Sequence, residues 1–193
     1  FRERIDVPSG QRRALVIGDP RGDPHPGDGP LPEAEEEAKE VAGQLERYGY
    51  AVTRLIGREV MPTQVINALL SHAWTIVHVA AHGDVQKEIS AGLPFFTDTA
   101  DGVRQRMRKA TGVVLGKDVF LEPCLLDQMQ VPPELFFVNC CHLGKMRPDA
   151  KPGATPVEDA VALSGRPELA ASFAVQLIRM GVRGVIAAGW AVN

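Results

Sequence analysis

Short, wholly apolar runs alternate with segments of helical periodicity along most of this chain. The apolar runs predict strands that are buried on both faces of a sheet, and apolar residues spaced three and four apart predict helices. The strands are expected over residues 13–19, 50–55, 74–81, 134–139 and 184–192, and the helices over residues 32–48, 62–72 and 167–180. Strands that alternate with helices are typical of a mostly parallel sheet flanked by helices, so the sequence predicts an α/β fold.

Three segments interrupt this alternation. Residues 20–32 and 143–166 are rich in Pro and Gly and are expected to be loops. Residues 85–112 have no clear period and contain a basic cluster, so they are expected to form an insertion that is partly loop. Before the fourth strand, residues 112–121 suggest a hairpin-like turn and residues 124–129 a short helical turn.

The composition is that of one globular domain, since 193 residues, 45% hydrophobic and 23% charged, can form a substantial core. No apolar run approaches the ~20 residues of a membrane span, and the polar N-terminus does not resemble a signal peptide. The formal net charge of −3 gives no support for a nucleic-acid or membrane partner. Three cysteines, two of them adjacent, argue against a disulfide scaffold and favour a reducing cytoplasm.

Groups that can carry chemistry follow three of the predicted strands. Asp19 ends the first strand, His82 and Gly83 follow the third, and the adjacent pair Cys140 and Cys141 follows the fourth. In an open α/β sheet, functional sites form at the carboxyl ends of the strands. If the third and fourth strands are neighbours, an imidazole and a thiol meet at one edge, where they can act as base and nucleophile in acyl transfer. The glycine after the histidine would let a backbone N–H approach an oxyanion.

Other histidines and cysteines have plainer interpretations. His78 lies within a strand and is expected to pack in the core, and Cys124 is expected to be a buried, inert thiol. Strand alternation directs Cys140 and Cys141 to opposite faces, so one of them should belong to the core. A zinc site at the adjacent cysteines is disfavoured, because neighbouring residues do not wrap one tetrahedral ion, and we predict no metal. Spacing alone leaves the His–Cys pair as one of several interpretations.

The motifs, in their order, resemble those of CHAT domains, which are caspase-like (clan CD) cysteine peptidases. The stretch Ile-Val-His-Val-Ala-Ala-His-Gly over residues 76–83 is similar to the family's strand that ends in His-Gly. The stretch Phe-Phe-Val-Asn-Cys-Cys-His-Leu-Gly over residues 136–144 resembles its Leu-Ser-Ala-Cys-x-x-Gly segment. Further similar segments are residues 13–19, 31–38, 45–52 and 173–192. The resemblance implies a caspase-like three-layer fold, with a mostly parallel central sheet flanked by helices.

The resemblance also assigns roles to residues near the two motifs. It implies that His82 is the general base and Gly83 the oxyanion glycine. It implies that Cys141 is the nucleophile, because Gly144 follows three residues later as in the family motif, and that Cys140 takes the place of the family's small residue, usually Ala. The implied activity is that of a cysteine endopeptidase that cleaves protein or peptide substrates without a cofactor.

Substrate specificity in caspase-like enzymes depends on the loop after the first strand and the segment after the last strand. Asp19 and Trp190 are therefore expected to contact the substrate, and an acid there would favour a basic residue before the cut. The family pattern continues beyond Asn193, so we expect residues 1–12 to be a flank and residues 13–193 to be a CHAT domain truncated at its C-terminal end. CHAT domains commonly occur in longer proteins with helical-repeat or sensor modules, which implies regulation by such domains.

Two alternatives remain. The chain could be a catalytically silent CHAT domain that serves as a scaffold or sensor, although the intact His-Gly and Cys motifs argue against this. It could also be a nucleotide-binding α/β domain, an idea suggested by the stretch Gly-Asp-Pro-Arg-Gly over residues 18–22. Neither the dinucleotide-binding Gly-x-Gly-x-x-Gly motif nor a P-loop is present, which disfavours that alternative.

Overall fold

A computed structural model of the chain describes residues 12–20, 29–90, 95–96, 103–104, 107–141 and 170–188. For residues 85–90, 95–96, 103–104, 107–109 and 141 it describes the backbone alone. The helical segments are α1 (Pro32–Arg47), α2 (Pro62–Ser71), the 3₁₀ helix η1 (Pro123–Gln128) and a helix over residues 170–180. The strands are β1 (Arg13–Gly18), β2 (Ala51–Ile56), β3 (Ile76–Ser90), β4 (Phe95–Phe96), β5 (Val103–Arg104), β6 (Met107–Gly116), β7 (Val119–Leu121), β8 (Leu135–Cys141) and β9 (Gly184–Ala188).

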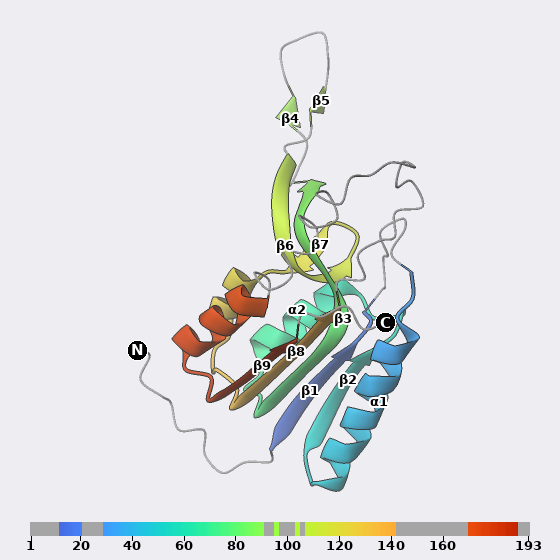
Figure 1. The fold of residues 1–193 in the computed structure, drawn as a ribbon, viewed down its shortest axis with the longest axis vertical. Coiled ribbons are helices and arrows are strands. Elements are labelled where there is room, and N and C mark those ends of the chain that lie inside the picture. The colour runs from blue at the N-terminus through green and yellow to red at the C-terminus, as the bar shows by residue number, and fades with distance from the viewer. Residues whose placement is uncertain are drawn as a thin grey trace, which may run out of the picture.

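Seven strands form one mostly parallel sheet (Figure 1). Its parallel part has the order β2-β1-β3-β8-β9, and every pairing between these five strands is parallel. Strands β6 and β7 extend it through antiparallel pairings, while β4 and β5 form a separate two-stranded ladder. The predicted α/β class and caspase-like arrangement are confirmed. The four residues 14–17 of β1 are fully buried, as expected of an apolar strand covered on both faces.

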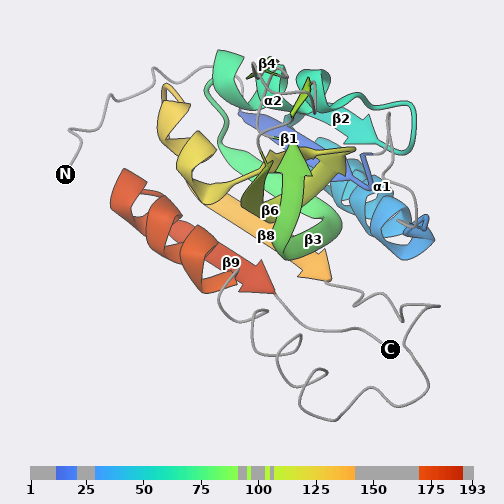
Figure 2. The same ribbon diagram turned by 90° about the horizontal axis from the view of Figure 1, so that it is seen from above.

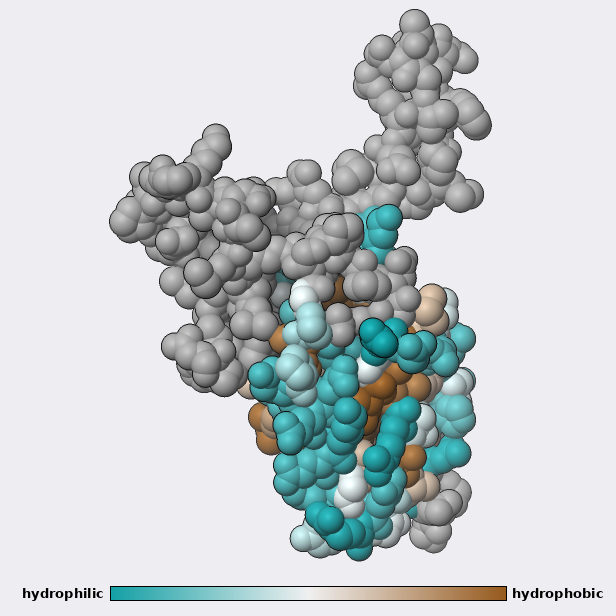
Figure 3. Space-filling view, turned by 90° about the vertical axis from the view of Figure 1, so that its right-hand side faces the viewer, coloured by the Kyte–Doolittle hydropathy of each residue, from teal (hydrophilic) through white to brown (hydrophobic). Residues whose placement is uncertain are grey.

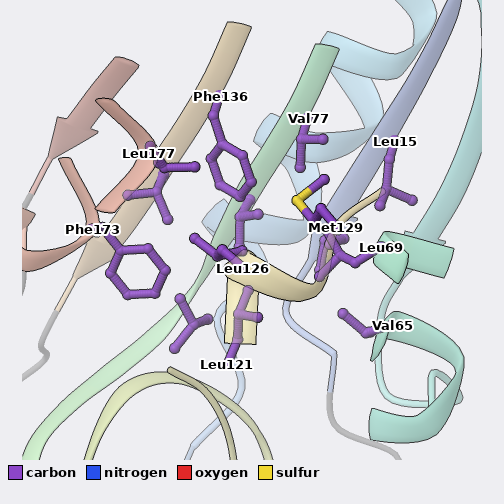
Figure 4. Close-up of a cluster of buried hydrophobic side chains, with 14 of the residues drawn as sticks. Leu15, Val65, Leu69, Val77, Leu121, Leu126, Met129, Phe136, Phe173 and Leu177 are labelled. Atoms are coloured by element: carbon purple, nitrogen blue, oxygen red, sulfur yellow. The ribbon is translucent and has the colours of Figure 1, made fainter. Parts of the chain in front are cut away.

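Helices cover both faces of the parallel part (Figure 2). The larger apolar core lies on the face toward α2, η1 and the helix over residues 170–180. Figure 4 shows this cluster, in which Phe136 of β8 lies near Leu126 of η1 and Phe173 and Leu177 of the last helix. On the opposite face, Val16 packs against Ala38 and Ala42 of α1. Seen from the α1 side, the described surface is mostly hydrophilic (Figure 3), so α1 turns a polar face to solvent.

Helix α1 packs closely on β1 because Gly18 has no side chain. A Cβ on Gly18 would collide with the Cβ of Ala38 and lie 3.1 Å from the carbonyl oxygen of Ala34. The first glycine of the stretch that suggested nucleotide binding therefore has a structural reason to be glycine, namely the contact between helix and sheet.

The third strand is longer than predicted. It does not end at residue 81 but continues through His82 and Gly83 to Ser90. Its second half leaves β1 and β8 and pairs with β6, with a shift of register between Asp84 and Lys87. Residues 85–90 show no strand periodicity, and their extended backbone is stabilised by pairing with β6, which is distant in sequence. Likewise, β8 extends two residues beyond the predicted end and includes both adjacent cysteines.

Other boundaries agree with the predictions to within a few residues. Both predicted helices between the first three strands are present, and the helical turn before the fourth strand is η1. No helix of the described residues is long and apolar enough to cross a membrane.

Candidate active site

The proposed base and nucleophile stand opposite each other on neighbouring strands. β3 and β8 pair in parallel, and their register aligns Ala80 with Asn139, Ala81 with Cys140 and His82 with Cys141. Neighbouring strands lie roughly 4.8 Å apart, so the backbones of the last pair are adjacent. The condition that the sequence left open, that the third and fourth strands be neighbours, is therefore met.

The first of the two adjacent cysteines, Cys140, packs in the core on the face of the sheet toward α2. Cys140 is 4% exposed and belongs to the large apolar cluster, together with Ala81 of β3. The prediction that one cysteine of the pair packs in the core is confirmed for Cys140.

His82 is oriented by a backbone carbonyl. Its Nε2 lies 2.8 Å from the carbonyl oxygen of Gly29, in the segment that leads into α1. Because a carbonyl oxygen can only accept, the proton of this hydrogen bond belongs to Nε2. In the neutral imidazole, Nδ1 then carries the lone pair and can accept a proton.

Asp19 lies at the end of β1, next to the same segment. Its backbone N–H donates to the carbonyl oxygen of Ala80 over 2.9 Å, and its Oδ2 accepts from the N–H of Leu31, also over 2.9 Å. The residue is 1% exposed and has a φ of +41°. Asp19 therefore ties the end of β1 both to β3 and to the start of α1.

Glu37 of α1 contacts polar side chains of both β3 and β8. The Nδ2 of Asn139 donates to Oε2 of Glu37 over 2.9 Å. The other oxygen of Glu37, Oε1, lies 3.2 Å from Nε2 of His78, although the angle is not that of a hydrogen bond. The ring of His78 stacks on Phe137 with centroids 4.8 Å apart. Glu37 therefore connects α1 with both strands of the candidate site.

His78 is a packing residue, as predicted. It is 5% exposed, and burial lowers its pKa from 6.5 to about 4. The ring is therefore neutral at pH 7, and its contact with Glu37 is not an ion pair under those conditions.

Sequence reasoning missed Glu37 and Asn139. Glu37 belongs to a run of acidic residues near the start of α1, where negative charge is favourable to a helix whatever the side chain contacts. Asn139 carried a usable signal, because a polar residue in an otherwise apolar strand needs a hydrogen-bond partner. The identity of that partner, on a helix about a hundred residues away, had no local signal.

The remaining predicted site residues are placed in part. Gly83 is buried, follows His82 directly and stands opposite Val113 in the register of β3 and β6. Trp190 and Gly144 lie outside the described residues. Within the described part of the chain, no group of three or more His, Cys, Asp or Glu could hold a metal ion.

The expectation for Cys124 was wrong, because this thiol is exposed rather than buried. The 3₁₀ helix η1 has three residues per turn, and its buried residue Leu126 is followed three residues later by the buried Met129. Cys124 lies off this stripe and faces solvent.

Comparison with known proteins gives one result. The family model described as CHAT domain matches residues 1–193, which is the whole chain. Searches of curated proteins and of solved structures gave no significant match.

Proposed function

The chain belongs to the CHAT domain family, which is related to the caspase-like cysteine peptidases, and we propose that it is itself a cysteine endopeptidase. In this proposal His82 and Cys141 form the catalytic dyad and cleave protein or peptide substrates. The observation that carries it is the direct register of these two residues at the carboxyl end of the parallel pairing between β3 and β8, beyond which β3 pairs with β6 instead. That is the edge at which open α/β sheets form their sites.

The proposed reaction proceeds through an acyl-enzyme. His82 Nδ1 accepts the thiol proton while the sulfur of Cys141 attacks the scissile carbonyl carbon, and a C–S bond forms. The N–H groups of Gly83 and Cys141 stabilise the oxyanion. The imidazolium then gives its proton to the leaving amine as the C–N bond breaks. Water hydrolyses the thioester with His82 again as base, which releases the acid and restores the thiol.

Two structural features support the assignment of roles. The hydrogen bond to Gly29 leaves the lone pair of neutral His82 on Nδ1, so the ring has an acceptor for the thiol proton. Cys140 is buried in the apolar cluster, where a thiolate would be poorly solvated, and this favours Cys141 as nucleophile.

The finer parts of the proposal concern specificity and context. Trp190 is proposed to contact the substrate, and a contact between Asp19 and the residue before the cut would favour a basic residue there. The proposed peptidase is regulated by helical-repeat or sensor domains in the same polypeptide. Its proposed location is the cytoplasm. Cleavage of a fluorogenic peptide library by the purified chain tests the specificity, and a clear preference for Asp before the cut would contradict it.

The catalytic assignment is tested with Cys141→Ala and the matched control Cys140→Ala. We expect the first variant to lower peptide cleavage by more than about a thousandfold, because the nucleophile is lost. The second should retain most of the activity, since Cys140 packs in the core. A peptide acyloxymethyl ketone should label Cys141 of the unsubstituted chain, with the site mapped by mass spectrometry.

Two outcomes would contradict the proposal. If Cys140→Ala abolishes cleavage while Cys141→Ala retains it, the nucleophile is misassigned. If the unsubstituted chain neither cleaves any peptide of the library nor labels selectively at Cys141, the domain is a catalytically silent scaffold or sensor.

A further inference from the structure

A closed series of hydrogen bonds connects His82 to its own strand through the end of β1. The N–H of Asp19 donates to Ala80, two residues before His82. The carboxylate of Asp19 accepts from the N–H of Leu31, and the carbonyl of Gly29, two residues before Leu31, accepts from His82. Removing any one of these bonds opens the series.

The residue type at position 19 satisfies two demands at once. A φ of +41° is disfavoured for most residues, although Asp and Asn adopt it more readily than others. Glycine would meet the backbone demand but has no acceptor for the N–H of Leu31. With 1% of its surface exposed, the carboxylate is held inside the protein.

We propose that Asp19 is a positioning residue for His82. Its carboxylate holds residues 29–31 against the sheet edge, so that the Gly29 carbonyl keeps the imidazole proton on Nε2 and the lone pair on Nδ1. The expected effect of Asp19 on the rate of peptide cleavage rests on the cysteine-peptidase function proposed above. The tautomer of His82 does not depend on that function. This role competes with direct contact between Asp19 and a basic substrate residue.

Two substitutions at position 19 separate the effect of the hydrogen-bond acceptor for Leu31 from the effect of the positive φ. Asp19→Gly removes the acceptor and relieves the positive φ, so a loss in this variant is not due to strain. Asp19→Asn keeps an oxygen that can accept from Leu31 and tolerates the same φ, but removes the negative charge. The pair therefore distinguishes positioning, which needs the acceptor, from recognition of a basic residue, which needs the charge.

The first measurement is the ¹⁵N NMR signature of the His82 ring in the Cys141→Ala background, at a pH where the ring is neutral. The parent should show one tautomer, with the proton on Nε2. Asp19→Gly should show a mixture of the two tautomers, and Asp19→Asn should restore the parent signature. A ring that keeps the single Nε2–H tautomer in Asp19→Gly would overturn the proposal.

The second measurement is kcat and KM for two fluorogenic peptides that differ only in Arg or Gln before the cut. Asp19→Gly should lower kcat by about tenfold for both peptides with little change in KM, because proton transfer by the base is impaired. Asp19→Asn should recover most of that loss. If both variants instead raise KM for the Arg peptide alone, Asp19 contacts substrate and is not a positioning residue.

The two measurements also separate this proposal from the proposed function. If the unsubstituted chain cleaves no peptide but the NMR signature changes as expected, the peptidase proposal fails and the role of Asp19 stands. If the chain is an active peptidase and the signature of Asp19→Gly does not change, the role of Asp19 fails alone.

Discussion

The face of the sheet toward α2 and the face toward α1 differ in chemistry, although the same strands build both. Toward α2, β3 and β8 contribute apolar residues such as Val79 and Phe136 to one continuous cluster. Toward α1, the alternate positions of the same strands include His78 and Asn139, which contact Glu37. Stability is therefore concentrated on the first face, and the polar groups of the candidate site are concentrated on the second.

The largest effect on stability is expected on the α2 face. Phe136→Ala should lower the free energy of unfolding by about 3–5 kcal/mol, because Phe136 is fully buried and its loss leaves a cavity. Phe137→Ala is the matched control on the next residue, which is half-buried and stacks on His78. Urea denaturation measures the free energy of unfolding of both variants. Equal losses in the two variants would contradict the inference that stability is concentrated on the α2 face.

The second prediction concerns the pH dependence contributed by His78. Burial lowers its folded pKa to about 4, below the unfolded value of 6.5, so the unfolded state binds the proton more readily. The contribution of His78 to stability should therefore be complete above pH 6.5 and fall as the pH drops toward 4. The full loss is about 3 kcal/mol at one pKa unit per 1.36 kcal/mol.

His78→Gln tests whether protonation of His78 causes this loss of stability at low pH, since glutamine does not titrate. Stability measured by denaturant at pH 7, 6, 5 and 4 should fall less steeply in the variant than in the parent. Glu37 is the charged group that faces His78 from α1, so His78→Gln should be measured with and without Glu37→Gln. Parallel pH profiles of parent and His78→Gln would show that His78 does not cause the decline.

The third prediction tests the close contact between α1 and β1. Gly18→Ala should destabilise the fold by about 1–3 kcal/mol, because the added Cβ meets Ala38 and the helix must move away from the sheet. Gly43→Ala on the same helix is the control, since a Cβ there meets nothing within 4 Å. Thermal unfolding should show a lower midpoint for Gly18→Ala and no decrease for Gly43→Ala.

The smallest expected effect is at Glu37. Glu37→Ala should cost about 1 kcal/mol, because Asn139 loses the acceptor of its hydrogen bond to α1. Glu37→Gln should cost less, since its amide oxygen can still accept from Asn139. The exposed neighbour Glu36 offers the control Glu36→Ala. If both alanine variants lower the free energy of unfolding equally, the effect comes from the charge on the helix and not from the hydrogen bond between Glu37 and Asn139.

Much of the fold could be predicted because its signals are local. The apolar run of β1 and the helical spacing of Ala38 and Leu45 depend only on neighbours in the chain. The extension of β3 beyond His82 was missed, since residues 85–90 carry no periodic signal and depend on pairing with β6. Burial of Cys124 was predicted wrongly, because the periodicity of a short 3₁₀ turn cannot be distinguished reliably from that of an α-helix.

The sequence by itself determined the alternation of strands and helices, the family resemblance and the two residues proposed as base and nucleophile. Only the tertiary structure decided that β3 and β8 are neighbours and that His82 stands opposite Cys141. It also decided that Gly29 orients His82 and that Glu37 bridges both strands. The physical reason is that periodicity is encoded by adjacent residues, whereas these bonds join groups 53 and 102 residues apart that meet only when the chain has folded.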